Sequence, residues 1–436
     1  MQLEKLGITA LNAMQQQAGK AILHSHHDVV VLSPTGTGKT LAYLLPITQM
    51  IDAQHNDVQA LVVVPGRELA LQSHRVLLSM GSGLRSAACY GGRAAMDEHK
   101  ILNKVHPHVI FGTPGRLNDH LSKGNISPYG VRILVIDEFD KCLEMGFHDE
   151  MTRLLGRLPG VRQRILLSAT DAEQIPHFVK TDNMVRVDYL PQEEQLSTRV
   201  TLYDVPSPTK DKLNILRQLL YAQGGRQTIV FLSFRDAVER VGTYLQRHGF
   251  YVSIFHGGLE QKQREDAIYK FSNGSVNILV CTDLASRGLD IPDIGNVIHY
   301  HLPQNEQELI HRVGRTARWD KAGRTYFIVG PEEQMPPFVS ANVEHYTPPP
   351  TTPQQPLPPT MSTIYIGKGK KDKLSKGDIL GFLCKKGGLQ PTDVGRIDVM
   401  DRYTYAAVSR TKVEQVLQQV QGQKIKGIKT VVETVK

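Results

Sequence analysis

The chain has 436 residues, which is long enough for two or three domains. Of these residues 40% are hydrophobic and 22% are charged, a composition typical of folded globular proteins. No apolar run reaches the ~18 residues that a membrane-spanning helix needs, and the polar start MQLEKL does not fit a signal peptide. The four cysteines lie far apart without a Cys-x-x-Cys pair, so we expect reduced thiols in a cytoplasmic protein, with neither disulfides nor a structural metal.

The net charge of +8 is concentrated at one end of the chain. Residues 361–436 contain 15 Lys and Arg against 7 Asp and Glu, whereas residues 1–360 contain 36 of each. A small basic domain on a neutral body is typical of nucleic-acid-binding appendages, but a solvated lysine-rich tail has the same composition. Charge alone leaves both interpretations open.

Short apolar runs separated by helical patterns fill the first 340 residues. The first series is 29–32, 61–64, 109–111, 133–136 and 165–167, and the second is 228–232, 252–255, 278–280, 297–298 and 325–329. Unbroken rather than alternating hydrophobicity indicates strands buried on both faces, as in parallel sheets covered by helices. The two series predict two tandem α/β domains, at residues 1–190 and 195–342.

A phosphate-binding loop follows the first predicted strand. It reads Ser33-Pro34-Thr35-Gly36-Thr37-Gly38-Lys39-Thr40, which fits the P-loop except that Ser33 replaces glycine. Glycines let backbone N–H groups wrap a phosphate, and the following helix N-terminus adds a favourable dipole. We expect the whole segment to bind ATP, with Lys39 on the β- and γ-phosphates and the Thr40 hydroxyl on Mg²⁺.

Acidic residues follow a later predicted strand, which we expect to lie beside the P-loop strand. They form the sequence Asp137-Glu138-Phe139-Asp140. At such a strand end, Asp137 is expected to bind Mg²⁺ and Glu138 to activate the attacking water. Another predicted strand ends in Ser168-Ala169-Thr170, whose two hydroxyls are expected to bond Asp140 and sense the nucleotide. Without a P-loop, such acids would indicate only a solvated helix start.

The second domain has no P-loop of its own. It carries TDLASRGLD at residues 282–290 and HRVGRTAR at residues 311–318. Arg315 and Arg318 are three residues apart, so on one helix face they can approach a single phosphate. We expect both to act as arginine fingers on ATP held by the first domain. The alternative is a basic surface helix.

Together these segments resemble the DEAD-box RNA helicases of superfamily 2, over about residues 5–330. Further matching segments are PGREL at 65–69, Gly91-Gly92, TPGR at 113–116, VFLSFR at 230–235, and Gln261 with Arg264. The resemblance implies that Gln15 reads adenine, that Asp290 contacts the nucleotide and that His311 couples nucleotide to RNA. It also implies RNA contacts by Arg67, Gly92, Thr113, Arg116, Arg264 and Thr282.

The chain departs from the family pattern at several positions. Phe139 replaces the alanine of Asp-Glu-Ala-Asp, and Asn12-Ala13 replaces the Pro-Thr that precedes the glutamine of the Q motif. Gly66 replaces a threonine expected to touch RNA, and Ala317 replaces a glycine of the arginine-finger motif. Because position 139 carries no ligand atom, we expect the chemistry to survive that change.

A proline-rich segment, TPPPTTPQQPLPPT at 347–360, precedes the basic end of the chain. Proline lacks a backbone N–H and favours extended spacers. We therefore expect a linker at residues 343–361 that lets the last domain, 362–436, act as a tether.

The last domain mixes predicted strands (363–366, 403–408) with predicted helices (375–385, 412–421), as in a small α+β sandwich. It resembles the RRM-like RNA-binding domain of the DbpA/YxiN subgroup, which implies a hairpin of large-subunit ribosomal RNA as target. Lys368, Lys370 and Lys371 are expected to bind RNA. Tyr403 and Tyr405 share one strand face, where they either stack on bases or are sheet-core aromatics.

These observations predict an α/β protein of two tandem RecA-like parallel-sheet domains plus an RRM-like domain, using ATP and Mg²⁺. The hypothesis is an RNA helicase that remodels ribosomal RNA in pre-ribosomal particles of the large subunit, with no membrane partner. ATP and RNA would close the two domains and assemble Lys39, Glu138, Arg315 and Arg318 around the γ-phosphate. The alternatives are an ATP-gated RNA clamp that does not unwind, and a DNA helicase.

Overall fold

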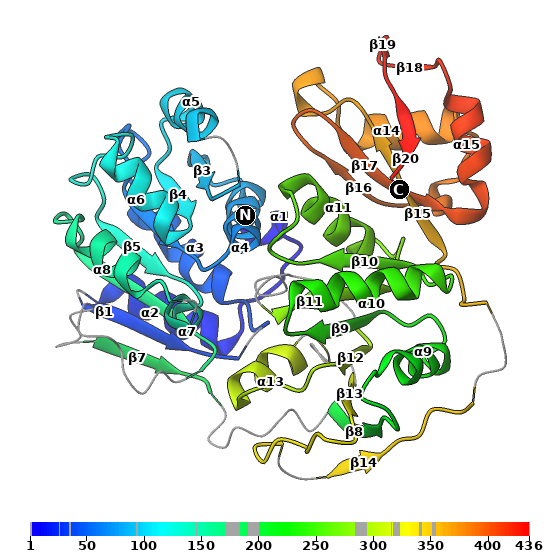
Figure 1. Ribbon diagram of the computed structural model, residues 1–436. Coiled ribbons are helices and arrows are strands. Elements are labelled where there is room, and N and C mark those ends of the chain that lie inside the picture. Colours follow the sequence, from blue (N-terminus) through cyan, green and yellow to red (C-terminus); the bar gives the residue numbers. More distant parts are fainter. Residues whose placement is uncertain are drawn as a thin grey trace. The chain divides into compact units, whose positions relative to one another are not determined.

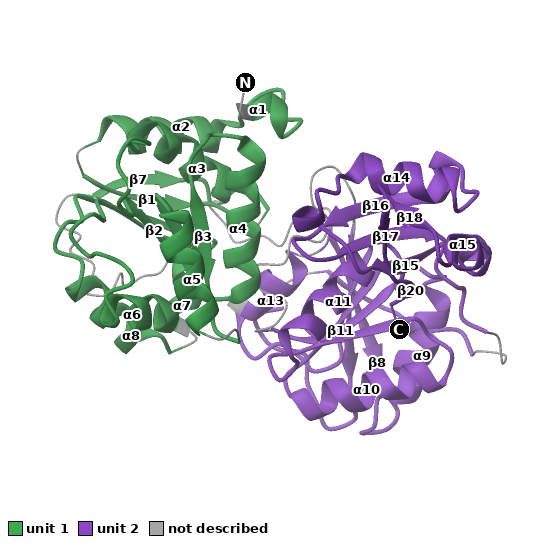
Figure 2. Cartoon of the chain, turned by 90° about the horizontal axis from the view of Figure 1, so that it is seen from above, with its two compact units in different colours: residues 1–195, 287–290 green, residues 196–286, 291–436 purple. Residues whose placement is uncertain are grey.

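The computed structural model describes most of the chain. The described residues are 2–25, 27–34, 36–92, 95–144, 146–170, 184–190, 200–283, 294–314, 316, 323–339, 342–350 and 355–435. They form two compact units, unit 1 up to residue 190 and unit 2 from residue 200 onward (Figure 2). None of the described helices is long and apolar enough to span a membrane.

Unit 1 is a parallel sheet flanked by helices (Figure 1). Its described strands pair in the order β3-β4-β2-β5-β6-β1-β7, and all neighbours are parallel. The strands are β1 (Asp28–Leu32), β2 (Ala60–Val63), β3 (Ser86–Cys89), β4 (Val109–Gly112), β5 (Ile133–Ile136), β6 (Gln163–Ser168) and β7 (Met184–Asp188). The helices are α1 (Gln2–Lys5), α2 (Ala13–His24), α3 (Lys39–Met50), α4 (Arg67–Met80), α5 (Ala95–Val105), α6 (Pro114–Ser122), α7 (Phe139–Glu144) and α8 (His148–Gly156).

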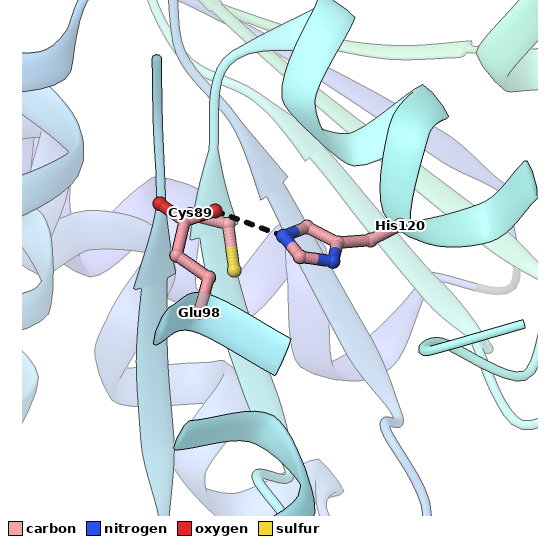
Figure 3. Close-up of side chains that lie close together, drawn as sticks. All are labelled: Cys89, Glu98 and His120. Carbon is pink, nitrogen blue, oxygen red and sulfur yellow. Dashed lines mark hydrogen bonds and ion pairs between the residues drawn. The ribbon is translucent and has the colours of Figure 1, made fainter. Parts of the chain in front are cut away.

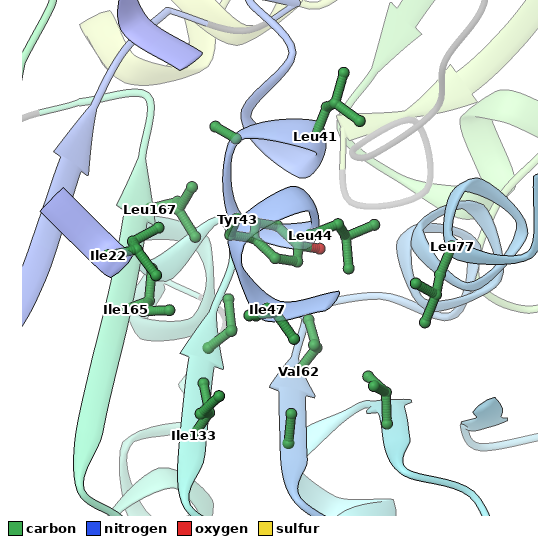
Figure 4. Close-up of a cluster of buried hydrophobic side chains, with 14 of the residues drawn as sticks. Ile22, Leu41, Tyr43, Leu44, Ile47, Val62, Leu77, Ile133, Ile165 and Leu167 are labelled. Atoms are coloured by element: carbon green, nitrogen blue, oxygen red, sulfur yellow. The ribbon is translucent and has the colours of Figure 1, made fainter. Parts of the chain in front are cut away.

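Both faces of this sheet are buried. Val29 and Val31 of β1 pack with side chains of α2, α3 and α4, whereas Val30 and Leu32 pack on the opposite face with side chains of α6 and α8. Figure 4 shows the first cluster, in which Ile47 of α3 lies over the strands. Burial of each such side chain stabilises the fold by roughly 1.5–3 kcal/mol. Burial on both faces explains the unbroken apolar runs in the sequence.

Unit 2 begins with a second parallel sheet. Its described strands pair in the order β10-β11-β9-β12-β13-β8-β14. The strands are β8 (Val200–Pro206), β9 (Thr228–Leu232), β10 (Val252–Phe255), β11 (Ile278–Thr282), β12 (Asn296–His299), β13 (Gly323–Val329) and β14 (Val343–His345). The helices are α9 (Leu213–Ala222), α10 (Arg235–Arg247), α11 (Gln261–Ser272) and α13 (Glu306–Val313).

The end of unit 2 is a small antiparallel sheet with two helices. Four described strands, β15 (Met361–Ile366), β16 (Val394–Val399), β17 (Thr404–Ser409) and β20 (Val432–Thr434), pair in the order β16-β17-β15-β20. The other elements are α14 (Lys376–Lys385), α15 (Val413–Val420), the short 3₁₀ turns η1 (Lys370–Asp372), η2 (Pro391–Asp393) and η3 (Arg410–Lys412), and the hairpin β18 (Lys424–Ile425) and β19 (Ile428–Lys429).

The predicted fold class is confirmed: two parallel-sheet domains are followed by a small α+β domain. Each of the ten predicted apolar runs coincides with a strand. The apolar runs do not predict β3, because its sequence Ser86-Ala87-Ala88-Cys89 lacks branched apolar side chains. They also do not predict β7 and β8, because exposed or partly exposed residues interrupt the buried ones in these strands.

The proline-rich linker predicted a loosely coupled last domain, but within the described part of unit 2 the sheet of this domain lies against helix α11. One face of the sheet, with Ile364 and Ile366, packs on α14 and α15. Side chains alternate along a strand, so Thr363 and Tyr365 belong to the other face. The Thr363 hydroxyl accepts a hydrogen bond from Asn273 Nδ2 at 2.8 Å, directly beyond the end of α11.

Aromatic and charged side chains form most of this contact. The rings of Tyr269 on α11 and Tyr405 on β17 lie 4.7 Å apart between centroids. The Tyr269 hydroxyl donates to the carbonyl of Tyr405 at 3.1 Å, and the Tyr405 hydroxyl donates to the Asp266 carboxylate. The Tyr403 hydroxyl donates to Glu265 at 3.0 Å. We call the helix surface made by Glu265, Asp266 and Tyr269 the α11 face.

The C-terminal part of the proline-rich linker also packs on unit 2. Pro356 and Leu357 line a small cavity together with Tyr221 and Phe250. The Arg410 side chain donates to the carbonyl of Pro359 at 2.7 Å and to that of Ser275 at 2.8 Å. The linker therefore follows the domain surface at residues 356–359.

Candidate functional site

The P-loop connects β1 to α3 and surrounds the Lys39 side chain. Gly36 and Gly38 have φ values of 87° and 85°, a left-handed conformation that favours glycine. Lys39 is the first residue of α3 and is 9% exposed. Its Nζ donates to the carbonyls of Ser33 at 2.6 Å and Pro34 at 3.0 Å. The ammonium group is thus held inside the loop, where a bound phosphate would meet it.

Side-chain hydroxyls and amides brace the same loop. Ser33 Oγ donates to Thr37 Oγ1 at 2.6 Å, and Thr37 Oγ1 donates to the carbonyl of Pro34 at 2.9 Å. Gln15 Nε2 donates to the carbonyl of Gly38 at 3.2 Å. Thr40 follows Lys39 in the first turn of α3. Thr35 lies outside the described residues.

Asn12 contacts the P-loop, although it is not among the site residues predicted from the sequence. Its Nδ2 donates to the carbonyl of Thr37 at 2.9 Å, while its Oδ1 caps α2 by accepting from the backbone N–H of Gln15. Asn at the N-cap with Gln at N3 is a sequence signal for the start of α2, but it does not predict the contact with Thr37. Asn12 and Gln15 together connect α2 to the loop.

The acidic segment follows β5. Strand β6 lies between β5 and the P-loop strand β1, so the prediction that the two strands are neighbours is wrong. All three strands are parallel, and their carboxyl ends share one edge of the sheet. Asp137 is 2% exposed, and its pKa is raised to about 7 by burial and by the charge of Glu138, although Lys39 lowers it. The acid therefore lies within electrostatic reach of the P-loop lysine.

Glu138 has a positive φ of 51°, a strained conformation for a residue with a side chain. Its backbone N–H donates to the side chain of its own neighbour, Asp137 Oδ1, at 3.0 Å. The chain turns here from β5 into α7, which begins at Phe139. The predicted water-activating residue thus occupies a sharp strand-to-helix turn.

Asp140 connects the acidic segment to β6. Thr170 Oγ1 donates to Asp140 Oδ2 at 2.9 Å, which is one of the two predicted hydroxyl contacts. Ser168 instead donates from Oγ to the carbonyl of Thr170 at 2.6 Å and accepts from its N–H. Asp140, Ser168 and Thr170 are all buried. Ser168 therefore orients Thr170 rather than binding Asp140 itself.

The predicted RNA contacts of unit 1 gather around two turns. Arg67 is the first residue of α4, and a Cβ atom on Gly92 would collide with its guanidinium. Thr113 is the N-cap of α6, and Arg116 lies in the first turn of that helix. Arg116 Nε is 3.3 Å from a carboxylate oxygen of Glu98. Arg67 and Gly92 are thus brought together, and Glu98 holds Arg116.

In unit 2, the structure describes some of the predicted residues. Arg264 on α11 is 6% exposed, and its guanidinium lies 5.0 Å from the Phe255 ring centroid. Thr282 ends β11, and His311 lies on α13, both buried. Asp290, Arg315 and Arg318 lie outside the described residues.

The predicted RNA-binding residues of the last domain separate into two groups. Lys370 and Lys371 are exposed on η1, while Lys368 is partly exposed and pairs with Asp372 at 3.2 Å. Tyr405 is only 1% exposed, because the α11 face covers it. Of the two interpretations of the tyrosines, this arrangement favours packing over base stacking.

Three family matches cover most of the chain. Residues 12–177 match the DEAD/DEAH box helicase family, residues 211–320 match the helicase conserved C-terminal domain, and residues 363–434 match the DbpA RNA binding domain.

Relatives match over nearly the whole length. The chain is 35% identical to the ATP-dependent RNA helicase DbpA of Escherichia coli (strain K12), over 98% of this chain and 94% of that protein. It is 29% identical to the ATP-dependent RNA helicase DbpA of Bacillus subtilis (strain 168), over 98% and 95%. Mss116p bound to ssRNA and AMP-PNP is a similar solved structure, with a TM-score of 0.72 and 27% identity over 80% of this chain and 77% of that one. The chain therefore belongs to the DEAD-box family of ATP-dependent RNA helicases, and it carries a DbpA-type RNA-binding domain at its C-terminal end.

Proposed function

We propose that this helicase remodels ribosomal RNA during assembly of the large ribosomal subunit. The observation that carries the enzymatic part is the placement of two buried residues, Lys39 in the P-loop and Asp137 at the end of β5, along one edge of the same parallel sheet. The match of residues 363–434 to the DbpA RNA binding domain supports the choice of target. The buried free thiols Cys89, Cys142 and Cys281 are consistent with work in the reducing cytoplasm.

The residues at this edge of the sheet fit Mg²⁺ together with ATP. Mg²⁺ prefers hard oxygen ligands, which the Thr40 hydroxyl and the Asp137 carboxylate would supply. Burial raises the pKa of Asp137 to about 7, so a nearby dication would favour its charged form. When bound, the ion supplies charge that neutralises the phosphates. Lys39 would add a second positive charge on the β- and γ-phosphates, and Glu138 would accept a proton from the attacking water.

The proposed cycle depends on closure of the two RecA-like domains on RNA. ATP and RNA together favour the closed state, in which Arg315 and Arg318 reach the γ-phosphate bound to Lys39. Formation of the complete site only in that state explains why RNA would stimulate hydrolysis. Loss of the γ-phosphate then reopens the domains and releases the separated strand.

The first test is Lys39→Ala in the full chain. Removal of the ammonium from the phosphate site should lower RNA-stimulated ATP turnover by at least about 100-fold, because the charge acts in a buried site. Release of inorganic phosphate with saturating RNA is the measurement. Lys20→Ala on the exposed part of α2 is the matched control and should leave turnover unchanged. Turnover near that of the wild type in Lys39→Ala would place the nucleotide elsewhere.

The second test separates chemistry from binding. Glu138→Gln keeps the side-chain size but removes the proton acceptor, so ATP should still bind while hydrolysis stops. With ATP present, the variant should hold RNA longer than the wild type, measured as a slower off-rate of a fluorescent single strand. Normal hydrolysis by Glu138→Gln would exclude it as the base.

A short-duplex assay distinguishes a helicase from the alternative, an ATP-gated clamp. A helicase should release the labelled strand of a ribosomal RNA duplex when ATP is added. A clamp would hydrolyse ATP without releasing it. Stimulation by a ribosomal hairpin that does not exceed stimulation by a scrambled RNA would contradict the proposed target, and equal stimulation by single-stranded DNA would favour a DNA helicase.

A further inference from the structure

A buried carboxylate, Glu98, lies between two segments proposed to touch RNA. It is on α5, is 1% exposed, and is not among the residues assigned to the site from sequence. Its Oε1 accepts a hydrogen bond from the backbone N–H of Tyr90 at 2.9 Å, directly before Gly91-Gly92. Its Oε2 lies 3.3 Å from Nε of Arg116. The two oxygens of one side chain thus hold two different turns.

His120 completes the arrangement from α6, one helical turn after Arg116. Figure 3 shows its ring directed toward the carboxylate of Glu98. Its Nε2 lies 2.8 Å from Glu98 Oε2, and its Nδ1 lies 3.0 Å from Nδ2 of Asn125. Because the Asn125 amide nitrogen can only donate, Nδ1 is the acceptor and Nε2 carries the proton. His120 therefore donates to Glu98, and the buried carboxylate is satisfied on both oxygens.

We infer that Glu98 is a positioning residue for RNA binding: it fixes the Arg116 guanidinium and the Gly91-Gly92 turn in the geometry that receives the RNA backbone. This inference rests on the proposed RNA contacts of Gly92 and Arg116. A guanidinium carries five N–H donors, so an arginine held through Nε can still present its terminal nitrogens to a phosphate. A fixed guanidinium loses less side-chain entropy on binding than a mobile one.

The same cluster contains Cys89, which raises the question of a metal site. The Cys89 sulfur, a Glu98 oxygen and a His120 nitrogen all lie within 4.8 Å of one another. Burial and the charge of Glu98 raise the pKa of the Cys89 thiol, which keeps it in the neutral form that binds metals poorly. Arg116 already supplies a positive charge to the carboxylate. The negative charge of Glu98 is therefore already compensated within the cluster, which favours a hydrogen-bonded ion pair over a cation site.

The test is the RNA dependence of ATP hydrolysis by Glu98→Gln. The amide can accept from Tyr90 through its oxygen, but its NH₂ group then faces two further donors, His120 Nε2 and Arg116 Nε. We expect the KM for RNA to rise about tenfold while kcat at saturating RNA falls less than twofold. A defect that only loosened the fold would lower kcat and the melting temperature together, and that pattern would overturn the inference.

A matched control is available on the same arginine. Asp119 Oδ2 lies 3.8 Å from Arg116 Nη1, but Asp119 is 34% exposed and also pairs with Lys123. Exposed pairs contribute little, so Asp119→Asn should leave the KM for RNA within twofold of the wild type. Cys89→Ala should do the same. A tenfold rise in the KM for Cys89→Ala would overturn the inference in favour of a metal or thiol site.

A double-mutant cycle shows whether Glu98 acts through Arg116. Arg116→Ala alone should raise the KM for RNA about tenfold or more, and adding Glu98→Gln should raise it less than twofold further. Independent, multiplicative effects would overturn the inference. The wild type serves as the separate check on the proposed function. If RNA stimulates hydrolysis by the wild type but Arg116→Ala leaves the KM for RNA unchanged, only this inference is contradicted. A wild type that RNA does not stimulate contradicts the proposed function itself.

Discussion

At the residue scale, Phe139 shows how a change in the family signature can be accommodated away from the chemistry. Phe139 is 2% exposed and belongs to the core cluster that includes Cys142, Met151 and Leu154. Its neighbours Asp137 and Glu138 lie in the turn after β5, outside that cluster. The Phe139 ring is therefore part of the hydrophobic core of unit 1, on the face of the sheet that α6 and α8 cover.

This placement predicts the result of Phe139→Ala, which restores the usual family sequence. Removing a buried ring should lower the free energy of unfolding by about 3–5 kcal/mol, because the surrounding core collapses only partly. ATPase activity of the folded variant should change less than tenfold. Urea unfolding and phosphate release at a temperature well below the transition measure the two effects.

Phe139→Leu is the matched control, since it leaves most of the volume in place and should cost about 1–1.5 kcal/mol. Complete loss of activity in a folded Phe139→Ala protein would show that the ring orients Asp137 or Glu138 directly.

Local spacing explains which site residues could be predicted from the sequence. The P-loop, the acids after β5 and the Thr170–Asp140 hydrogen bond all depend on residues that follow buried strands, and such strands are visible as apolar runs. Glu98 was missed because its role depends on Tyr90, which follows β3, and on Arg116 of α6, and only the fold brings these two residues to it. A single glutamate in an amphipathic helix has no sequence signal for such a role.

At the element scale, α11 serves two regions at once. Arg264 on this helix is a proposed RNA contact and packs against Phe255 of β10, whereas the α11 face binds the sheet of the last domain. Strand alternation correctly placed Tyr403 and Tyr405 on one face, and their ring centroids lie 5.1 Å apart. Alternation does not show what covers that face, because the partner residues are more than 130 positions earlier in the chain.

The contact between Tyr405 and Asp266 predicts a pH-dependent docking of the last domain. Burial raises the pKa of Asp266, although the Tyr405 hydrogen bond and the charges of Lys262 and Lys270 lower it and Glu265 raises it. The docked state thus holds the proton more tightly than the undocked state. Docking should strengthen as the pH falls below the raised pKa, reach its full gain below the ordinary pKa of aspartate, and lose that gain as the pH rises through the raised value.

Amide hydrogen exchange in α11 and β17 across acidic to neutral pH measures this dependence. Asp266→Asn keeps an acceptor for Tyr405 but cannot titrate, so the exchange protection of this variant should itself show no such pH dependence. Tyr405→Phe leaves a buried carboxylate without this donor and should weaken docking by about 1–3 kcal/mol at neutral pH. Identical pH profiles for the wild type and Asp266→Asn would contradict the assignment.

At the scale of the whole molecule, the net charge of +8 lies entirely within residues 361–436, on the domain that docks through its tyrosine face. Docking occupies that face, so the proposed contact with RNA moves to the exposed lysines of η1 and the residue after it, Lys370, Lys371 and Lys373. Deleting the domain would expose Tyr269, which is now 6% exposed. The contribution of this domain to RNA binding is therefore better tested with substitutions in the full chain.

Replacing Lys370, Lys371 and Lys373 by glutamine should weaken binding to every RNA, because phosphate contacts are independent of sequence. For each phosphate that the variant no longer neutralises, the slope of log K against log salt should fall by about 0.7–1, so the triple variant should show a slope smaller by up to about 3. Lys412→Gln is the control, since this lysine already pairs with Asp393 at 2.7 Å. Fluorescence anisotropy with a ribosomal hairpin and a scrambled RNA, each from low to high salt, gives both slopes. An unchanged slope in the triple variant, or an equal decrease in Lys412→Gln, would show that the positive charge of this domain acts only as a diffuse field.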